Sequence, residues 1–436
     1  MLVADLRIAW LSLVEHRRRA LFLGGAISGV TMLLVLLTSL STGVRTTLIE
    51  TATTLSTGHV NVGGFFKVTG GMAIPAVTHA SKVVEVATEA VPELEFAVQR
   101  GRGWAKLVSA TGSMQAGIGG IDIGSEQRFQ RALSIVDGSL DGLEEPGTIL
   151  LFREQADKLG VRAGDALTIS AQTTRGVNNT VDCRVAAIAK DVGMLSKFNV
   201  FIPAASLREL YQYRPDTTGA VQLYVRGDAV DDLGPITARL RTALQDAGYG
   251  VMDPDDRPFW MKFDTVSRQA WTGQKLDVTT WEGELSFLTW TLSAIDGLSW
   301  VLLVILVAIV IAGIMNTMWI AIRERTREIG TLRAIGMQRV NVVRMLLLES
   351  VLLGLFGALL GAGMGAGLAS LITSAHLEVP LAVQLFLMSD EVRLIAEPGA
   401  VLRAVLLLTA VTGLAALQPA LRAARLRPVD AMSHFG

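Results

Sequence analysis

Several patterns that carry chemistry are missing from this sequence of 436 residues. It has a single cysteine, Cys183, so no disulfide can form within the chain. The zinc spacings CxxC and HExxH are absent, and the five histidines are scattered. No GxxxxGK[ST] phosphate loop, GxSxG elbow or kinase motif set occurs, and no glycine is followed by lysine. We therefore expect no catalytic residue, no metal site and no cofactor in this chain.

Charged residues are also absent from four long apolar stretches. A bilayer core of about 30 Å is crossed by about 20 helical residues, whereas a buried helix of a soluble core has about 10 to 14 apolar residues. Hydrophobic residues make up 50% of the chain, and the mean hydropathy is +0.44. The sequence predicts an α-helical membrane protein with four transmembrane helices, at residues 20–44, 297–322, 345–377 and 404–421, the third with a charge-free part from Ser350 to Leu377.

The first apolar stretch, Ala20 to Val44, has 25 residues. The apolar core of a cleaved signal peptide has about 7 to 15 residues and precedes an A-x-A-like site. Because this stretch is longer and has no clear A-x-A site, we expect a retained span. Before it, residues 1–19 place apolar side chains at helical spacing beside the cluster Arg17–Arg19. This pattern favours a cytoplasmic amphipathic helix in the membrane interface over a plain soluble start of the span.

Arginines are distributed unevenly around the spans. Segments 1–19, 323–344 and 422–436 together have 13 arginines and five acidic residues, a net charge of +8. Segment 378–403 has a net charge of −2, and segment 45–296 has 24 basic and 30 acidic residues, a net charge of −6. Since positively charged loops stay in the cytoplasm, we expect both termini there and the two acidic segments outside. An acidic exterior argues against a nucleic-acid partner.

Residues 45–296 are predicted to form an α+β extracytoplasmic domain. Two β-α-β patterns, within 56–100 and 219–258, suggest one ferredoxin-like subdomain, the porter part, whose halves flank an insert. The insert, 101–218, has short alternating runs with frequent turns and is predicted to be β-rich. From 259 to 296 the pattern is helical, and we expect a long stalk that leads into the second span.

The third span is rich in glycine. Gly357, Gly361 and Gly365 recur at intervals of four residues. Such GxxxG pairs let two transmembrane helices approach closely. We expect these three glycines to pack the third span against a neighbouring helix.

The most informative segment directly follows the second span. Residues 324–336 are dense in charge, rich in helix formers, and end at a glycine. This pattern predicts a short helix on the membrane face that stops sharply and can receive a push from a soluble partner. We predict a coupling loop at 323–344 that contains this helix. Nearby, Glu349 is expected either to pair with an arginine or to sit at the membrane interface.

The run E-R-T-R-E-I-G-x-x-R-A-I-G after a transmembrane helix resembles the MacB/LolC–LolE/FtsX superfamily of ABC permease subunits. The resemblance covers nearly the whole chain, including the basic start, the large domain between the first two spans, and the ending Pro419–Met432. Within the insert, the runs at 147–151 and 201–203 look like the exterior-domain pattern of this family.

The resemblance implies a four-span permease of the bacterial inner membrane, with a periplasmic MacB-like domain and cytoplasmic termini. It implies that the coupling loop docks on a separate ABC ATPase, present in two copies, which binds ATP and Mg²⁺. The candidate contact residues for this ATPase are then Glu324, Arg325, Glu328, Ile329, Gly330, Arg333, Ala334 and Gly336. This chain would then be a non-catalytic subunit and would pair with a second permease chain as a homo- or heterodimer. Because the fused nucleotide domain of MacB is missing, the LolC/LolE or FtsX layout is the better match.

The leading hypothesis is mechanotransmission. ATP-driven closure would move the coupling loop and the periplasmic domain, and would release or export a lipoprotein or another amphiphilic substrate. One alternative is an efflux or lipid-export permease with a periplasmic carrier or adaptor. Another is an FtsX-like regulator of a cell-wall hydrolase, and a pure sensor or anchor is the last.

Overall fold

The computed structural model describes Glu15 and residues 17–68, 73–377, 379–380, 384, 388–389 and 391–425. The chain divides into two compact units. The helical unit comprises residues 1–46, 292–379 and 391–436, and the mixed α/β unit comprises residues 47–291 and 380–390. The predicted amphipathic helix at 1–19 and the predicted tail at 422–436 lie almost wholly outside the described residues.

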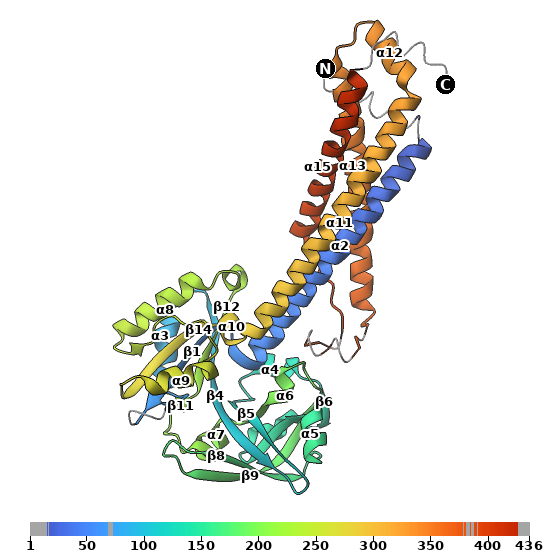
Figure 1. Cartoon of the computed structure of the whole chain (residues 1–436). Coiled ribbons are helices and arrows are strands. Elements are labelled where there is room, and N and C mark those ends of the chain that lie inside the picture. Colours follow the sequence, from blue (N-terminus) through green and yellow to red (C-terminus); the bar gives the residue numbers. More distant parts are fainter. Residues whose placement is uncertain are drawn as a thin grey trace. The chain divides into compact units, whose positions relative to one another are not determined.

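Four helices of the described chain are long and apolar enough to cross a membrane (Figure 1). They are α2 (Arg17–Ala52), α11 (Ser286–Glu324), α13 (Arg339–Ser374) and α15 (Pro398–Ala424). Together with the mixed α/β unit they confirm the predicted fold class. The chain therefore fits a multi-pass membrane protein.

Two predicted boundaries of the spans differ from the structure. Helix α13 ends at Ser374 instead of residue 377, because His376 adopts a left-handed backbone conformation with φ 46° that no helix can continue. Helix α15 begins at Pro398, inside the predicted loop 378–403. Proline suits a first helical position because its missing N–H would have no partner there.

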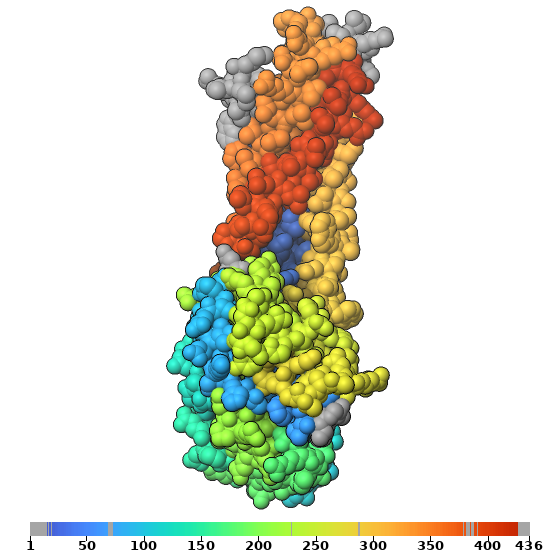
Figure 2. Space-filling view, turned by 90° about the vertical axis from the view of Figure 1, so that its left-hand side faces the viewer, coloured from blue at the N-terminus to red at the C-terminus, as the bar shows by residue number. Residues whose placement is uncertain are grey.

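One buried apolar cluster holds the helical unit together. All four helices contribute to it, through side chains such as Ile27, Ile314, Leu346 and Leu408, each at most 5% exposed. Figure 2 shows α13 in orange and α15 in red lying side by side at the surface. Each helix therefore buries one stripe within the unit, and the remaining apolar surface, which includes Leu360, Leu371 and Leu414, is exposed.

The glycine repeat of α13 lies against α2. A Cβ added at Gly357 would lie 3.0 Å from the carbonyl oxygen of Gly24, and one at Gly361 would overlap the carbonyl oxygen of Ser28. Gly365 faces the next turn of α2 in the same way. The two backbones therefore approach closely enough that only glycine fits between them.

Replacement of Gly361 by leucine should separate α2 from α13 and lower the melting temperature of the purified full chain. Gly363 provides the matched control, because no atom lies within 4 Å of a Cβ added there. Gly363→Leu should leave the melting temperature within a few degrees of wild type, since its side chain would point into open space. Equal losses in the two variants, measured by thermal unfolding in detergent, would rule out this contact as the reason for the glycine.

The first part of the mixed α/β unit is a split βαβ subdomain. Its strands lie in the order β13-β14-β1-β12-β4, and helices α3 and α8 follow β1 and β12. The bounds are β1 (Val60–Lys67), α3 (Ala80–Ala90), β4 (Leu94–Val108), β12 (Ala220–Val225), α8 (Gly234–Asp246), β13 (Gly250–Val251) and β14 (Gly273–Thr280). With β1, β4, β12 and β14 as first to fourth strands, the order is fourth-first-third-second and neighbours are antiparallel, as in ferredoxin-like folds.

The prediction of a helical stalk over 259–296 is wrong in its middle. The segment contains α9 (Phe259–Arg268), the strand β14, and α10 (Trp281–Glu284) before α11 begins. All eight residues of β14 pair with β1, and Leu276 and Val278 are buried by this pairing. Pairing and burial outweigh the local helical pattern. The second strand of the β-α-β pattern predicted within 219–258 is only a two-residue edge strand, β13.

The second part is the β-rich insert. Its elements are β5 (Ser113–Ile121), α4 (Gln127–Ala132), β6 (Ile135–Gly138), β7 (Thr148–Phe152), α5 (Arg153–Leu159), β8 (Ala166–Gln172), β9 (Asn178–Ala189), α6 (Leu195–Phe198), β10 (Asn199–Pro203) and α7 (Ala204–Tyr211). The predicted boundary at residue 100 falls inside β4. The N-terminal half of this 15-residue strand pairs with β12, and its C-terminal half pairs with β5. One strand is thus shared by both parts (Figure 1).

The unit also has short elements. They are η1 (Thr53–Thr57), β2 (Ala73–Ile74), β3 (Val77–Thr78), η2 (Leu140–Glu144), β11 (Thr217–Thr218) and η3 (Gly227–Val230).

Candidate functional site

The predicted coupling loop contains one short helix, α12 (Thr326–Ala334). Helix α11 ends at Glu324, and Arg325 alone separates the two helices, with φ −99° and ψ 15°. The hydroxyl of Thr326 donates to the carbonyl oxygen of Ile322, 2.8 Å away, which supports the turn. Since α13 starts at Arg339, only Arg325 and residues 335–338 of the loop are not helical.

A Schellman motif ends α12. Gly336 has φ +106°, a value that glycine adopts readily and L side chains do not. The N–H of Gly336 donates to the carbonyl of Arg333, and the N–H of Met337 donates to the carbonyl of Leu332. The glycine at the end of the charged run is thus required by the backbone of the cap.

A buried ion pair ties α12 to α13. The guanidinium of Arg325 lies 3.1 Å and 3.4 Å from the two carboxylate oxygens of Glu349, and both side chains are 11% exposed. Glu328 also approaches Arg325, at 3.6 Å, but its side chain is 66% exposed. Of the two expectations for Glu349, the structure shows the pairing with an arginine.

The eight candidate contact residues do not share one face. Arg325, Ile329 and Gly330 are buried, with Ile329 only 2% exposed. Arg333 is half-buried. The exposed members are Glu324, Glu328, Ala334 and Gly336. The buried residues hold α12 in place, so only the exposed ones are available to a partner.

Sequence reasoning missed two exposed apolar side chains beside these residues. Ile335 is 81% exposed and Val340 is 70% exposed, on either side of the turn at Gly336. Their signal in the sequence is the presence of large apolar residues in an otherwise charged loop. Exposed apolar side chains rimmed by charge are typical of a protein contact.

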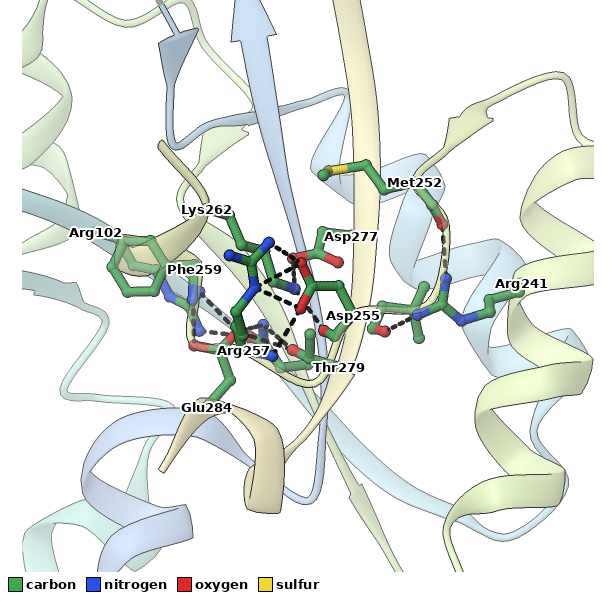
Figure 3. A network of polar contacts seen from close by, with 12 residues as sticks. Arg102, Arg241, Met252, Asp255, Arg257, Phe259, Lys262, Asp277, Thr279 and Glu284 are labelled. Atoms are coloured by element: carbon green, nitrogen blue, oxygen red, sulfur yellow. Dashed lines mark hydrogen bonds and ion pairs between the residues drawn. The ribbon is translucent and has the colours of Figure 1, made fainter. Parts of the chain in front are cut away.

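The mixed α/β unit contains a second concentration of polar groups, between α9, β14 and α10 (Figure 3). The ammonium of Lys262 lies 2.6 Å from a carboxylate oxygen of Asp277 and donates to the carbonyl oxygen of Asp255 at 2.8 Å. Burial raises the pKa of Asp277, and the positive charge of Lys262 opposes this rise. The pair is almost fully buried, so we assign it a structural role.

Arg102 lies at the other end of this network. Its guanidinium donates to the side-chain oxygen of Asn61 at 2.7 Å and lies 3.9 Å from a Glu284 oxygen (Figure 3). The guanidinium carbon lies over the Phe259 ring, 4.6 Å from the ring centroid. Burial lowers the pKa of Arg102, against the raising effect of Glu284. Within the described residues, no group of three or more His, Cys, Asp or Glu side chains is placed to hold a metal ion.

Comparisons with known proteins find relatives of the C-terminal part of this chain. Residues 300–428 match the model of the FtsX-like permease C-terminal domain, a range that includes α12 and α13. The macrolide export ATP-binding/permease protein MacB of Shigella sonnei is 37% identical over 133 residues, which cover 30% of this chain and 18% of that protein. MacB 1 of Yersinia pestis bv. Antiqua is 34% identical over 133 residues, with the same coverage. The aligned part is thus less than a fifth of the length of these relatives.

Solved structures align loosely with this chain. The extracellular domain of the noncanonical ABC-type transporter YknZ from Gram-positive bacteria aligns with a TM-score of 0.31 and 12% identity, over 43% of this chain and 94% of that one. The periplasmic region of MacB from Actinobacillus actinomycetemcomitans aligns with a TM-score of 0.29 and 14% identity, over 43% and 83%. The fold therefore rests on the strand order described above.

These observations define a multi-pass membrane protein with an FtsX-like permease domain at its C-terminal end. Residues 300–428 are similar to FtsX-like permeases and to MacB, so the predicted resemblance to the MacB/LolC/FtsX-like ABC permeases is confirmed. Permeases of this family work within ABC transporters as transmembrane subunits.

Removal of the Glu349 charge should destabilise the coupling segment. Glu349→Gln leaves the buried Arg325 without its closest carboxylate, and breaking a buried pair costs about 3–5 kcal/mol. We expect a clear loss of thermal stability in the purified full chain. Glu324→Gln, which changes an exposed carboxylate of the same loop, should have little effect. In a double-mutant cycle, Arg325→Met with Glu349→Leu should recover part of the loss; additive losses would show that the two residues do not interact.

Proposed function

We propose that this chain is the permease subunit of an ABC-type complex that transmits ATP-driven motion to its mixed α/β unit and so releases or exports a lipoprotein from the inner membrane. In this proposal, ATP and Mg²⁺ are bound by a separate ATPase, in two copies. A second permease chain, identical or related, would complete the complex.

The observation that carries this proposal is the fixation of α12. The segment is joined to α11 through one residue, to α13 through the Arg325–Glu349 pair, and is closed by the cap at Gly336. A force applied to its exposed residues would therefore be passed to both helices instead of being absorbed by a flexible loop. Helix α11 is continuous over 39 residues, which supports a role in transmitting motion along its length.

The MacB relatives, which are macrolide export ATP-binding/permease proteins, favour a second candidate, an efflux permease that works with a periplasmic adaptor. Regulation of a cell-wall hydrolase is the outcome to expect if the chain behaves like FtsX itself. Crosslinking from the mixed α/β unit distinguishes these functions: lipoprotein adducts support release, and hydrolase adducts would contradict transport.

The ATPase contact should depend on Ile335. A charge placed there by Ile335→Asp should oppose burial of this side chain against a partner, because a central apolar contact contributes about 2 kcal/mol or more to a protein interface. We expect the ATPase activity that copurifies with the full chain from native membranes to fall by about tenfold or more.

Ile335→Leu is the matched control for this experiment. It keeps the apolar side chain and should retain the wild-type activity. Full activity in the aspartate variant, with unchanged thermal stability, would show that the partner docks elsewhere.

The orientation proposed here places α12 in the cytoplasm and the mixed α/β unit in the periplasm. The arginine-rich loops support it, because such loops remain on the cytoplasmic side. A reporter fused at residue 330 and one fused at residue 150 should therefore report opposite faces of the membrane. If both reporters gave the same face, α12 could not relay force across the bilayer to the mixed α/β unit.

A further inference from the structure

We propose that a pocket within the mixed α/β unit binds the acyl chain of a single-chain amphiphile. The proposal rests on the proposed function, in which the mixed α/β unit handles a lipoprotein substrate. The pocket has a volume of about 420 Å³ and lies where β4 and β5 meet α6 and the start of α9. Its volume falls in the range of small-molecule sites, about 300–1,000 Å³.

Large apolar side chains surround the mouth of this pocket. Trp104 is 51% exposed, Met194 43%, Phe198 55% and Trp260 48%, and all four line the pocket. They come from three separate regions of the chain and converge on one opening. Scattered exposed apolar residues are normal on a protein surface, but a group gathered around a cavity marks a ligand site.

The interior offers apolar walls and no unpaired charge. Leu55, Ile118, Leu195, Phe201 and Leu285 line it. An acyl chain in this space would exchange water for these side chains, with a gain of about 25 cal/mol per Å² of apolar surface buried.

The charged groups at the pocket are neutralised by neighbours. Arg100 forms an ion pair with Glu126, and the side chains are 3% and 4% exposed. Arg102 is held by Asn61 and lies next to Glu284, as described above. A charged head group would therefore gain little inside, so an amphiphile would insert its chain and leave its head in water.

Two glycines of β5 shape the wall of the pocket. A Cβ at Gly117 would lie 2.8 Å from the amide oxygen of Asn199, and one at Gly119 would lie 2.7 Å from the Phe201 ring. Glycine at both positions therefore leaves room for the side chains of Asn199 and Phe201 on β10, the parallel neighbour of β5 in the sheet. The volume of about 420 Å³ admits a single acyl chain and is too small for a folded polypeptide.

The test is photocrosslinking in the full chain. The photoreactive residue p-benzoylphenylalanine replaces Phe198 at the rim or, as a control, Val177, which is 64% exposed and does not line the pocket. The protein is reconstituted into phosphatidylcholine vesicles and exposed to lysophosphatidylglycerol radiolabelled in its acyl chain. We expect labelled protein from position 198 at about ten times the level from position 177.

A pair of substitutions on β4 tests whether the label enters the pocket. Trp104→Glu puts a charge at the rim and should reduce labelling from position 198 severalfold. Val108→Glu puts the same charge on an exposed residue of the same strand outside the pocket and should leave labelling unchanged. Equal labelling from positions 198 and 177, or equal effects of the two glutamates, would overturn the proposal. So would a polypeptide adduct in place of the labelled lipid, since it would identify a protein contact.

Labelling is also measured in the Ile335→Asp variant, which separates this proposal from the function on which it rests. Labelling from position 198 should persist there, because the pocket does not involve α12. Absence of labelling in a chain that still binds its ATPase would overturn the pocket and leave the permease function standing.

Discussion

The burial of one arginine–glutamate pair is the constraint on which the coupling segment depends. Two charges withdrawn from water cost several kcal/mol each unless they compensate one another, so Arg325 and Glu349 stabilise a single geometry. That geometry fixes where α11 ends and α12 begins. The cap at Gly336 then fixes where α12 stops. The exposed residues between these two points, including Ile335, are therefore held in fixed positions relative to α11 and α13.

The mixed α/β unit uses buried charge in the same way. Lys262 and Asp277 join α9 to β14, and Arg102 with Glu284 joins β4 to α10. The first pair joins two consecutive elements, and the second joins elements about 180 residues apart in the sequence. Replacing one partner would leave an uncompensated charge in the interior, so these pairs favour one arrangement of α9, β14 and α10 over alternatives. Arg102 and Glu284 of this network also line the pocket.

Features that depend on local sequence could be predicted, and those that depend on distant pairing could not. The four apolar helices follow from length and the absence of charge, and the end of α12 follows from a glycine after a charged helix. The strand β14 could not be found this way, because its eight residues are held by pairing with β1, far earlier in the chain. The burial of Ile329 and the exposure of Ile335 also required the tertiary structure, since both are apolar residues of one short helical segment. The pocket joins residues from 55 to 285, a grouping that no local pattern indicates.

The long strand β4 has a mechanical consequence for the mixed α/β unit. Its 15 residues belong to the split βαβ sheet at one end and to the insert at the other, without an intervening loop. A hinge between the two parts would have to bend this backbone and break ladder hydrogen bonds on one side or the other. The split βαβ subdomain and the insert should consequently move together as one rigid body when a force acts on either of them.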